Sequence, residues 1–143
     1  MKPVESVDTV LTEIIRAGRT GGRMGKREDL GGLYVRSSWE ANYARYLNWL
    51  VEQEQILKWQ YEADEFIFKP IKRGCRSYLP DFKIYNLDGT IEYHEVKGWM
   101  DAKSKTKLKR MEKYYPNIKL ILIDKDAYYA IRRDIRYMIP NWE

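Results

Sequence analysis

One hairpin constrains the fold of this chain more than any other feature of its sequence. Residues 78–86 and 90–97 alternate apolar or aromatic side chains with polar ones, which is typical of strands, and the short loop between them ends in Gly89. A three-residue hairpin loop usually ends in a left-handed residue, and glycine adopts that conformation without strain. The loop therefore predicts two antiparallel strands in which Asn86 faces Thr90.

The register of this hairpin decides where its charged side chains point. Counting inward from a three-residue loop places Asp81 opposite Glu95, whereas a two-residue turn would place Asp81 opposite Val96 and send the two carboxylates to opposite faces. Glu95 and Lys97 share a face because they lie two positions apart in a strand. The chemistry of the resulting cluster favours the three-residue loop.

Two carboxylates beside an ammonium group suit metal-assisted cleavage of phosphodiester bonds. Carboxylate oxygens bind hard cations such as Mg²⁺ or Mn²⁺, and the cation activates water and neutralises charge that develops on the phosphoryl group. We expect Asp81 and Glu95 to bind the metal ion, with the Val96 carbonyl as a further oxygen ligand. Lys97 would orient the attacking water or stabilise the phosphoryl oxygens. A cross-strand ion-pair network among the same side chains is the competing interpretation.

The remaining elements predict a mixed α/β fold. We expect a helix over 39–51, an aromatic-rich strand over 57–69 with a break near 63–64, a helix over 101–115, an apolar strand over 118–123 and a helix over 126–137. The connection from strand 90–97 through a helix to strand 118–123 is long enough for a right-handed parallel crossover. The sequence therefore predicts a mixed central β-sheet with helices on both faces.

Glu40 allows two interpretations. Together with Ser37 it forms a capping box at the start of the helix over 39–51. It also lies at the border of the apolar stripe of that helix, where its carboxylate can reach the metal site and complete a second metal position.

The N-terminal part of the chain differs from the rest. Residues 6–17 carry apolar side chains at helical spacing, and residues 18–27 are rich in glycine and arginine without periodicity, which indicates a flexible basic arm or a plain linker. We therefore divide the chain into an N-terminal helix and arm, residues 1–33, and a main domain, residues 34–143. A short helix behind a hinge invites exchange between subunits.

Basic charge gathers in two parts of the sequence. The net charge is +5, and the basic residues concentrate between Arg16 and Arg36 and between Lys97 and Lys113. Clustered basic charge is expected of a protein that binds a polyanion, and beside a carboxylate pair it favours DNA or RNA. The candidate DNA-binding residues are Arg23, Lys26, Arg27, Arg36, Lys103, Lys105 and Lys107.

Composition excludes several classes of protein. No apolar run reaches the roughly 20 residues of a membrane helix, so we expect no membrane partner. The single cysteine, Cys75, excludes a disulfide framework and indicates a reducing, cytoplasmic setting. The single histidine, His94, excludes a histidine-dependent metal nuclease, and its position in the strand alternation places it on the face opposite Glu95.

Four local motifs resemble one family of nucleases. They are Ser38-Trp39-Glu40, Trp59-Gln60-Tyr61-Glu62, Tyr78-Leu79-Pro80-Asp81-Phe82 and Glu95-Val96-Lys97-Gly98. Together with the order of elements, they make the chain similar to the PD-(D/E)xK nuclease superfamily. Within it, residues 38–124 resemble the phage endonuclease I family, which resolves Holliday junctions.

The resemblance implies a fold, an activity and a set of residues. The core would be restriction-endonuclease-like, and Glu40, Asp81, Glu95 and Lys97 would be the catalytic set. The chain would be a Mg²⁺-dependent endodeoxyribonuclease, with Mn²⁺ as a possible substitute. It would act as a homodimer on branched DNA in phage DNA processing, in the host cytoplasm if a phage encodes it.

The same core leaves alternatives open. Sequence- or mismatch-directed nicking endonucleases and transposase-type end-cleaving nucleases share it. A DNA-binding protein that keeps only the fold is the non-enzymatic alternative.

Overall fold

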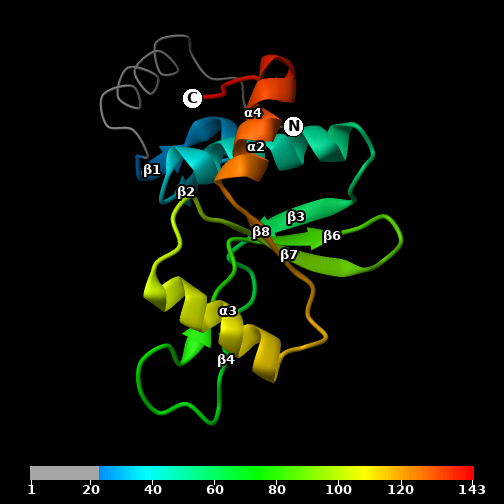
Figure 1. The fold of residues 1–143 in the computed structure, drawn as a ribbon. Coiled ribbons are helices and arrows are strands. Elements are labelled where there is room, and N and C mark those ends of the chain that lie inside the picture. The colour runs from blue at the N-terminus through cyan, green and yellow to red at the C-terminus, as the bar shows by residue number, and fades with distance from the viewer. Residues whose placement is uncertain (1–22) are drawn as a thin grey trace.

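A four-stranded mixed sheet forms the centre of the molecule. The structure is a computed structural model that describes residues 23–143. The sheet has the order β3-β6-β7-β8, formed by Lys58–Tyr61, Phe82–Tyr85, Ile91–Val96 and Leu120–Ile123. Neighbouring strands from β3 to β7 are antiparallel, and β8 runs parallel to β7. The predicted mixed α/β fold and the parallel crossover are therefore confirmed (Figure 1).

Helices cover both faces of this sheet. Helix α2 (Ser38–Glu52) and helix α4 (Lys125–Ile135) lie on one face, and helix α3 (Ala102–Tyr114) lies on the other (Figure 1). A short 3₁₀ helix, Arg136–Met138, follows α4. Within residues 23–143, no helix is both long and apolar enough to cross a lipid bilayer.

The main hydrophobic core lies between the sheet and α2. Ala41, Ala44 and Leu47 are fully buried on one stripe of α2 and pack with Phe82 and Ile84 of β6. The small alanine side chains let the helix approach the sheet closely. Burial of such apolar surface contributes about 25 cal/mol per Å² and holds α2 in a fixed position over the strands.

A smaller second core holds α3 against the opposite face. Strands β4 (Phe66–Ile67) and β5 (Ser77–Tyr78) form a separate two-stranded sheet beside α3, and Phe68, Tyr78 and Met111 are buried between them. We call α3, β4, β5 and the loop 68–76 the α3 lobe. A hydrogen bond from the Arg110 guanidinium to the Cys75 carbonyl ties the loop to the helix.

The predicted break in the strand 57–69 is confirmed. The segment is divided into β3 and β4, because Glu62 adopts a left-handed backbone with φ of 47°. The predicted strand 78–86 was wrong as a single unit, since β5 ends at Tyr78 and β6 begins at Phe82. Pro80 lies in the gap and has no N–H for a strand ladder.

The predicted hairpin register is confirmed. Phe82 pairs with His94 and Tyr85 with Ile91, and the Asn86 N–H donates to the Thr90 carbonyl oxygen at 2.9 Å. Gly89 has a φ of 89°, as the loop requires. The loop is therefore the three-residue form.

Side-chain caps fix where the helices begin. Ser37 Oγ accepts a hydrogen bond from the Glu40 N–H at 3.1 Å, and the Asp101 carboxylate caps α3 in the same way. Glu40 does not complete the predicted capping box, because its carboxylate accepts from the Arg36 N–H instead. Asp124 caps α4.

The first described residues belong to the body of the protein. Strands β1 (Gly25–Arg27) and β2 (Leu33–Val35) pair around a short 3₁₀ helix, Glu28–Leu30, and Leu30 and Val35 enter the main core. The predicted flexible arm is therefore wrong for Gly25–Arg27, and the predicted boundary at 33/34 cuts this hairpin. The predicted helix over 6–17 and residues 18–22 lie outside the described residues.

Candidate active site

A cleft of about 850 Å³ opens where the start of β6 and the end of β7 meet the helices. The buried Asp81 and the neighbouring Glu95 line its base, and Glu40 of α2 lines it as well. Lys97, which follows β7, and Lys107 of α3 also line the cleft. The cleft therefore gathers side chains from both faces of the sheet at one of its ends.

The hairpin register brings Asp81 and Glu95 together. Continued by one position beyond the last paired residues, it places Asp81 opposite Glu95. The Asp81 N–H donates to Glu95 Oε2 at 3.1 Å, and the Val96 N–H donates to Asp81 Oδ2 at 2.9 Å. On the other side, the Asp81 carbonyl accepts from the Glu62 N–H. These bonds fix both carboxylates at the base of the cleft.

Pro80 explains why the backbone of Val96 faces the cleft. The N–H groups of Tyr93 and Lys97 donate to β8, so by alternation the N–H and carbonyl groups of Val96 point toward β6. The same register places Pro80 opposite Val96, and proline has no N–H to donate to the Val96 carbonyl. The Val96 N–H bonds to the Asp81 carboxylate, and its carbonyl oxygen lacks the partner that an antiparallel ladder normally supplies.

The two carboxyl groups are electrostatically strained as anions. Burial raises the pKa of Asp81, and the negative charges of Glu95 and Glu40 raise it further. Burial also raises the pKa of Glu95, although the Lys97 ammonium acts in the opposite direction. Buried negative charge without a matching cation costs free energy, so this site favours a positively charged ligand.

Glu40 lies in the cleft but has protein partners of its own. Its Oε2 accepts from the Arg36 N–H at 2.7 Å and from the Tyr61 hydroxyl at 3.0 Å. Its charge reaches Asp81, but no group of three or more histidine, cysteine, aspartate or glutamate side chains within residues 23–143 is arranged to hold a metal ion. The structure thus joins Asp81 and Glu95 by a hydrogen bond and places Glu40 in the same cleft, where its charge acts on both. Its role as a metal ligand stays a prediction.

The oxygen atoms at the base of the cleft suit a small hard cation. Mg²⁺ usually keeps several water ligands and takes only one or two carboxylates from the protein. Asp81, Glu95 and the Val96 carbonyl supply such a set. The buried Tyr78 hydroxyl also lines the cleft beside Glu95, and its interaction with that carboxylate partly offsets the burial that raises the pKa of Glu95.

Only some of the predicted DNA-binding residues line the cleft. Arg36 and Lys107 line the cleft, whereas Lys26, Lys103 and Lys105 are exposed outside it.

Two arginines at the start of the described chain are held by contacts within the protein. Arg23 is half-buried, and its carbonyl accepts from Arg27. The prediction for Arg27 is wrong, because its side chain is only 2% exposed and forms an ion pair with Glu143 at 2.8 Å.

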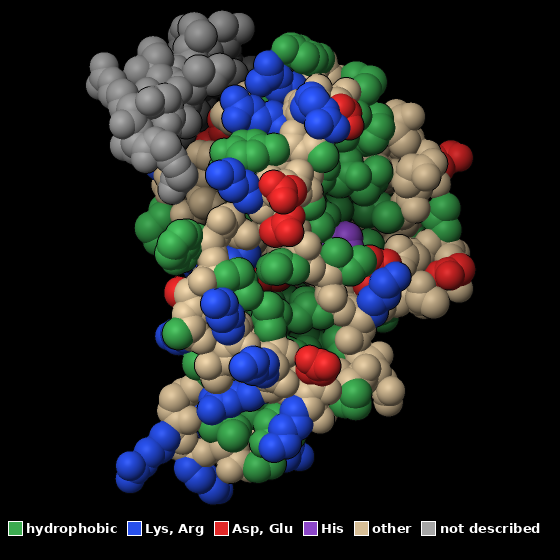
Figure 2. Space-filling view, viewed as in Figure 1, with side chains coloured by type: hydrophobic (Ala, Val, Ile, Leu, Met, Phe, Trp, Pro, Cys, Tyr) green, Lys and Arg blue, Asp and Glu red, His purple; other side chains and the backbone are tan. Residues whose placement is uncertain are grey.

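The basic surface of the α3 lobe is larger than the sequence analysis anticipated. Residues 69–76 and 102–114 carry ten basic side chains and one acidic one, Glu112, for a net charge of +9. The whole chain carries +5, so its remaining residues together carry −4. Figure 2 shows Lys and Arg side chains gathered at this end of the molecule. The sequence analysis did not name the basic residues of the loop 69–76 as DNA-binding candidates, although this segment has four basic residues and no acidic one.

Other lining residues left no signal in the sequence. Lys125 and Tyr129 reach the cleft only because α4 packs beside α2. His94, in contrast, lies as predicted on the face opposite Glu95, where its Nδ1 contacts the Tyr43 hydroxyl and its Nε2 contacts Glu92, each at 2.7 Å.

A family model described as "Protein of unknown function (DUF1064)" matches residues 25–130, about three quarters of the chain. The matched range includes every residue at the base of the cleft. No curated protein and no solved structure matches the chain.

Proposed function

We propose that this chain, which belongs to the DUF1064 family, is a metal-dependent endodeoxyribonuclease of the PD-(D/E)xK type. The observation that carries the proposal is the convergence of Asp81 and Glu95, two buried carboxylates on adjacent strands, at the base of an open cleft. A purely structural ion pair would place a cation between them. Here Lys97, whose charge partly offsets the burial that raises the pKa of Glu95, follows the same strand and lines the cleft.

Each residue at the base has a role in this proposal. Asp81, Glu95 and the Val96 carbonyl hold Mg²⁺, which when bound activates water and neutralises charge on the phosphoryl group. Lys97 lies beside Glu95, where its ammonium can donate hydrogen bonds to the attacking water or to a phosphoryl oxygen. Glu40 also lines the cleft, where its charge acts on Asp81, and the Tyr61 hydroxyl donates a hydrogen bond that holds the Glu40 carboxylate in place.

The distribution of charge supports DNA as the substrate. The α3 lobe carries a net charge of +9 and adjoins the cleft through Lys107. Phosphate groups along a duplex would bind this surface and so place one phosphodiester bond over the carboxylates. The substrate that fits the predicted family is branched DNA, such as a Holliday junction, cut by a homodimer with one cleft for each strand.

The direct test is cleavage of defined DNA substrates. A four-way junction, a linear duplex and a single strand would be incubated with the protein in Mg²⁺ or in EDTA. We expect symmetric cuts in the junction that require Mg²⁺, and cutting of linear DNA alone would instead indicate a nicking endonuclease.

Matched variants separate catalysis from binding. Asp81→Asn and Glu95→Gln should each abolish cleavage and leave DNA affinity largely intact. Asp134→Asn changes an exposed carboxylate on α4 and should cut at the normal rate. Binding of DNA without any cutting by the unmodified protein would refute the proposed activity and indicate a DNA-binding protein that keeps only the fold.

A further inference from the structure

Two aromatic side chains that line the cleft keep much of their surface exposed to water. Trp99 is 79% exposed and Tyr129 is 41% exposed, and both line the cleft that holds Asp81 and Glu95. Exposing a whole indole ring to water forgoes the apolar burial that tryptophan normally contributes. Such rings at the edge of a cleft mark a surface that meets a ligand.

Trp39, the neighbouring aromatic residue, has a different role. Its ring stacks on Tyr128 with centroids 4.0 Å apart and an interplanar angle of 6°, and it meets the Tyr129 ring edge to face with centroids 5.5 Å apart. It therefore supports Tyr129 from the protein side. One face of this aromatic group is packed, and the exposed part of Tyr129 is directed to the cleft.

Gly98 holds the backbone next to Trp99 against this group. A Cβ atom at position 98 would lie 2.9 Å from Cζ3 of Trp39, which is closer than side chains tolerate. Only glycine lets the chain leaving β7 pass this close to the Trp39 ring. Trp99 thus extends from a backbone that is fixed both by this contact and by the hydrogen bond from the Lys97 N–H to Ile123.

Two cations lie near the Tyr129 ring, and others line the cleft that it shares with Trp99. Lys125 Nζ lies 5.8 Å from the centre of the Tyr129 ring, and the Arg132 guanidinium lies 5.9 Å from it. Lys97 and Lys107 line the same cleft. Exposed aromatic rings among basic side chains are the combination by which proteins bind unpaired nucleotides, since bases stack on the rings and phosphates meet the cations.

We propose that Trp99 and Tyr129 form a stacking site for an unpaired nucleobase next to the phosphodiester bond to be cut. The inference rests on the proposed function for its nucleic-acid ligand and narrows the substrate class. The preferred DNA has a nucleotide released from pairing at the cleft, as at a branch point, a fork or a mismatch. A fully paired linear duplex offers no base to this site.

The experiment compares two single strands of equal charge. Fluorescence anisotropy in EDTA would measure the affinity of the full chain for a labelled oligothymidylate, for the same strand with abasic sugars, and for a blunt duplex. We expect the protein to bind the strand with bases about tenfold more tightly than the abasic strand. Trp99→Ala should remove this preference and leave duplex affinity within about twofold of the unmodified protein's. Trp99→Phe should keep part of the preference.

The control variant is Tyr137→Ala, which removes an aromatic side chain that is 82% exposed but does not line this cleft. It should retain the preference for bases. Equal affinity of the unmodified protein for the two single strands would overturn the stacking site. So would an equal loss of affinity for all three ligands in Trp99→Ala.

Failure of the nuclease proposal would look different. If the protein prefers bases through Trp99 but cuts no DNA in Mg²⁺, the stacking site stands and the catalytic assignment falls. If it cuts a four-way junction in Mg²⁺ but shows no preference for bases, the nuclease proposal stands and the stacking site falls.

Discussion

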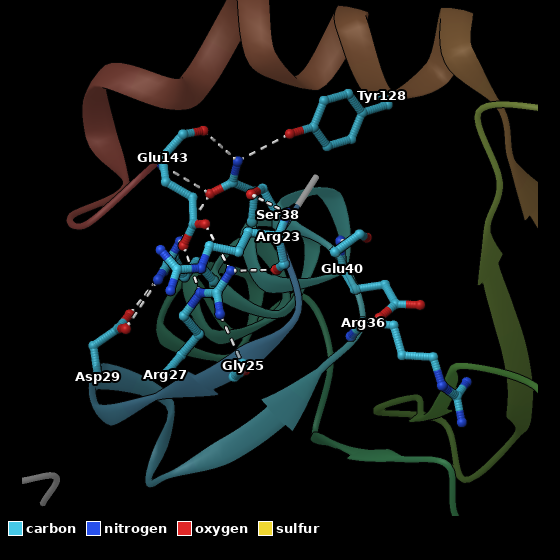
Figure 3. A network of polar contacts seen from close by, with 12 residues as sticks. Arg23, Gly25, Arg27, Asp29, Arg36, Ser38, Glu40, Tyr128 and Glu143 are labelled. Atoms are coloured by element: carbon cyan, nitrogen blue, oxygen red, sulfur yellow. Dashed lines mark hydrogen bonds and ion pairs between the residues drawn. The ribbon is translucent and has the colours of Figure 1, made fainter. Parts of the chain in front are cut away.

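Two buried clusters of charged side chains differ in whether positive and negative groups are paired. The first, which we call the arginine network, contains Arg27, Arg45, Asp29 and Glu143 (Figure 3). The second is the carboxylate pair at the base of the cleft, Asp81 and Glu95 with Glu40 nearby. Both are largely buried.

Charges in the arginine network are matched one to one. Arg45 donates to both Asp29 oxygens at 2.8 and 3.0 Å and to Glu143 at 2.9 Å, and Arg27 donates twice to Glu143 at 2.8 Å. Asn42 adds hydrogen bonds to Arg45 and to the backbone of Glu143. Two positive and two negative side chains thus satisfy one another.

Negative charge in the cleft has no such match. Asp81 and Glu95 receive backbone N–H groups, and burial raises the pKa of both carboxyl groups. In the arginine network burial alone would also raise the pKa of Glu143, but Arg27 and Arg45 hold it below its usual value. Burial thus goes with a lowered carboxyl pKa where guanidinium groups bond to the carboxylate, and with raised pKa values where they do not.

The largest expected effect comes from unbalancing the arginine network. Arg45→Met keeps the bulk of the side chain but leaves Asp29 and Glu143 without a shared cation, and it should lower the free energy of unfolding by about 3–5 kcal/mol. Urea denaturation would measure the change. Arg133→Met breaks an exposed pair with Asp134 and should cost less than about 1 kcal/mol. Equal losses in the two variants would mean that the network contributes no more than a surface pair.

The next largest effect is stabilisation of the folded protein by Mg²⁺. A cation that binds Asp81 and Glu95 only in the native state should add about 2.7 kcal/mol at one hundred times its dissociation constant. Thermal unfolding with and without Mg²⁺ would show a rise in Tm. The rise should disappear in Glu95→Gln and persist in Asp134→Asn. A Tm that Mg²⁺ leaves unchanged would contradict the metal site.

Replacing the Asp81 carboxyl should stabilise the protein in the absence of metal. Asp81→Asn keeps an oxygen to accept from the Val96 N–H and removes the free energy that the unfolded chain gains by ionising Asp81, for a gain of about 1–2 kcal/mol at neutral pH. The native pKa of Asp81 is raised, so its carboxyl contributes most stability below the usual carboxyl pKa and loses that contribution as pH rises toward the native pKa.

The pH dependence of that gain is the control. Thermal unfolding in EDTA should give similar Tm values for Asp81→Asn and the unmodified protein near pH 4 and a growing difference toward pH 8. A difference that shrinks with rising pH would show that Asp81 is stabilised as an anion, as Glu143 is in the arginine network.

The smallest effect concerns the cations beside the cleft. Lys107→Ala removes one cation from the wall and should lower the slope of log affinity against log salt for duplex DNA by about 0.9. Lys58→Ala changes an exposed lysine on β3, paired with Tyr85 at the end of the sheet away from Asp81, and should leave the slope unchanged. A titration of duplex binding against NaCl distinguishes the two.

The parts of the site that local chemistry determines could be predicted from the sequence. Gly89 requires a particular loop, the loop fixes the register, and the register brings Asp81 to Glu95. The caps by Ser37 and Asp101 follow from the same kind of short-range hydrogen bond.

Long-range contacts explain what could not be predicted. Arg27 looked like part of an exposed basic arm, and only the partner Glu143, 116 residues later, turns it inward. Tyr129 enters the cleft because of how α4 packs on Trp39, which no local pattern records. The break between β5 and β6 could have been predicted from the sequence, since Pro80 has no N–H to donate to a neighbouring strand.

That proline has a consequence for how the hairpin ends. Any other amino acid at position 80 would bring an amide hydrogen to the Val96 oxygen and add one more rung between β6 and β7. In the proposed metal site, the Val96 oxygen would then be occupied by pairing within the chain and would no longer be free to bind a cation.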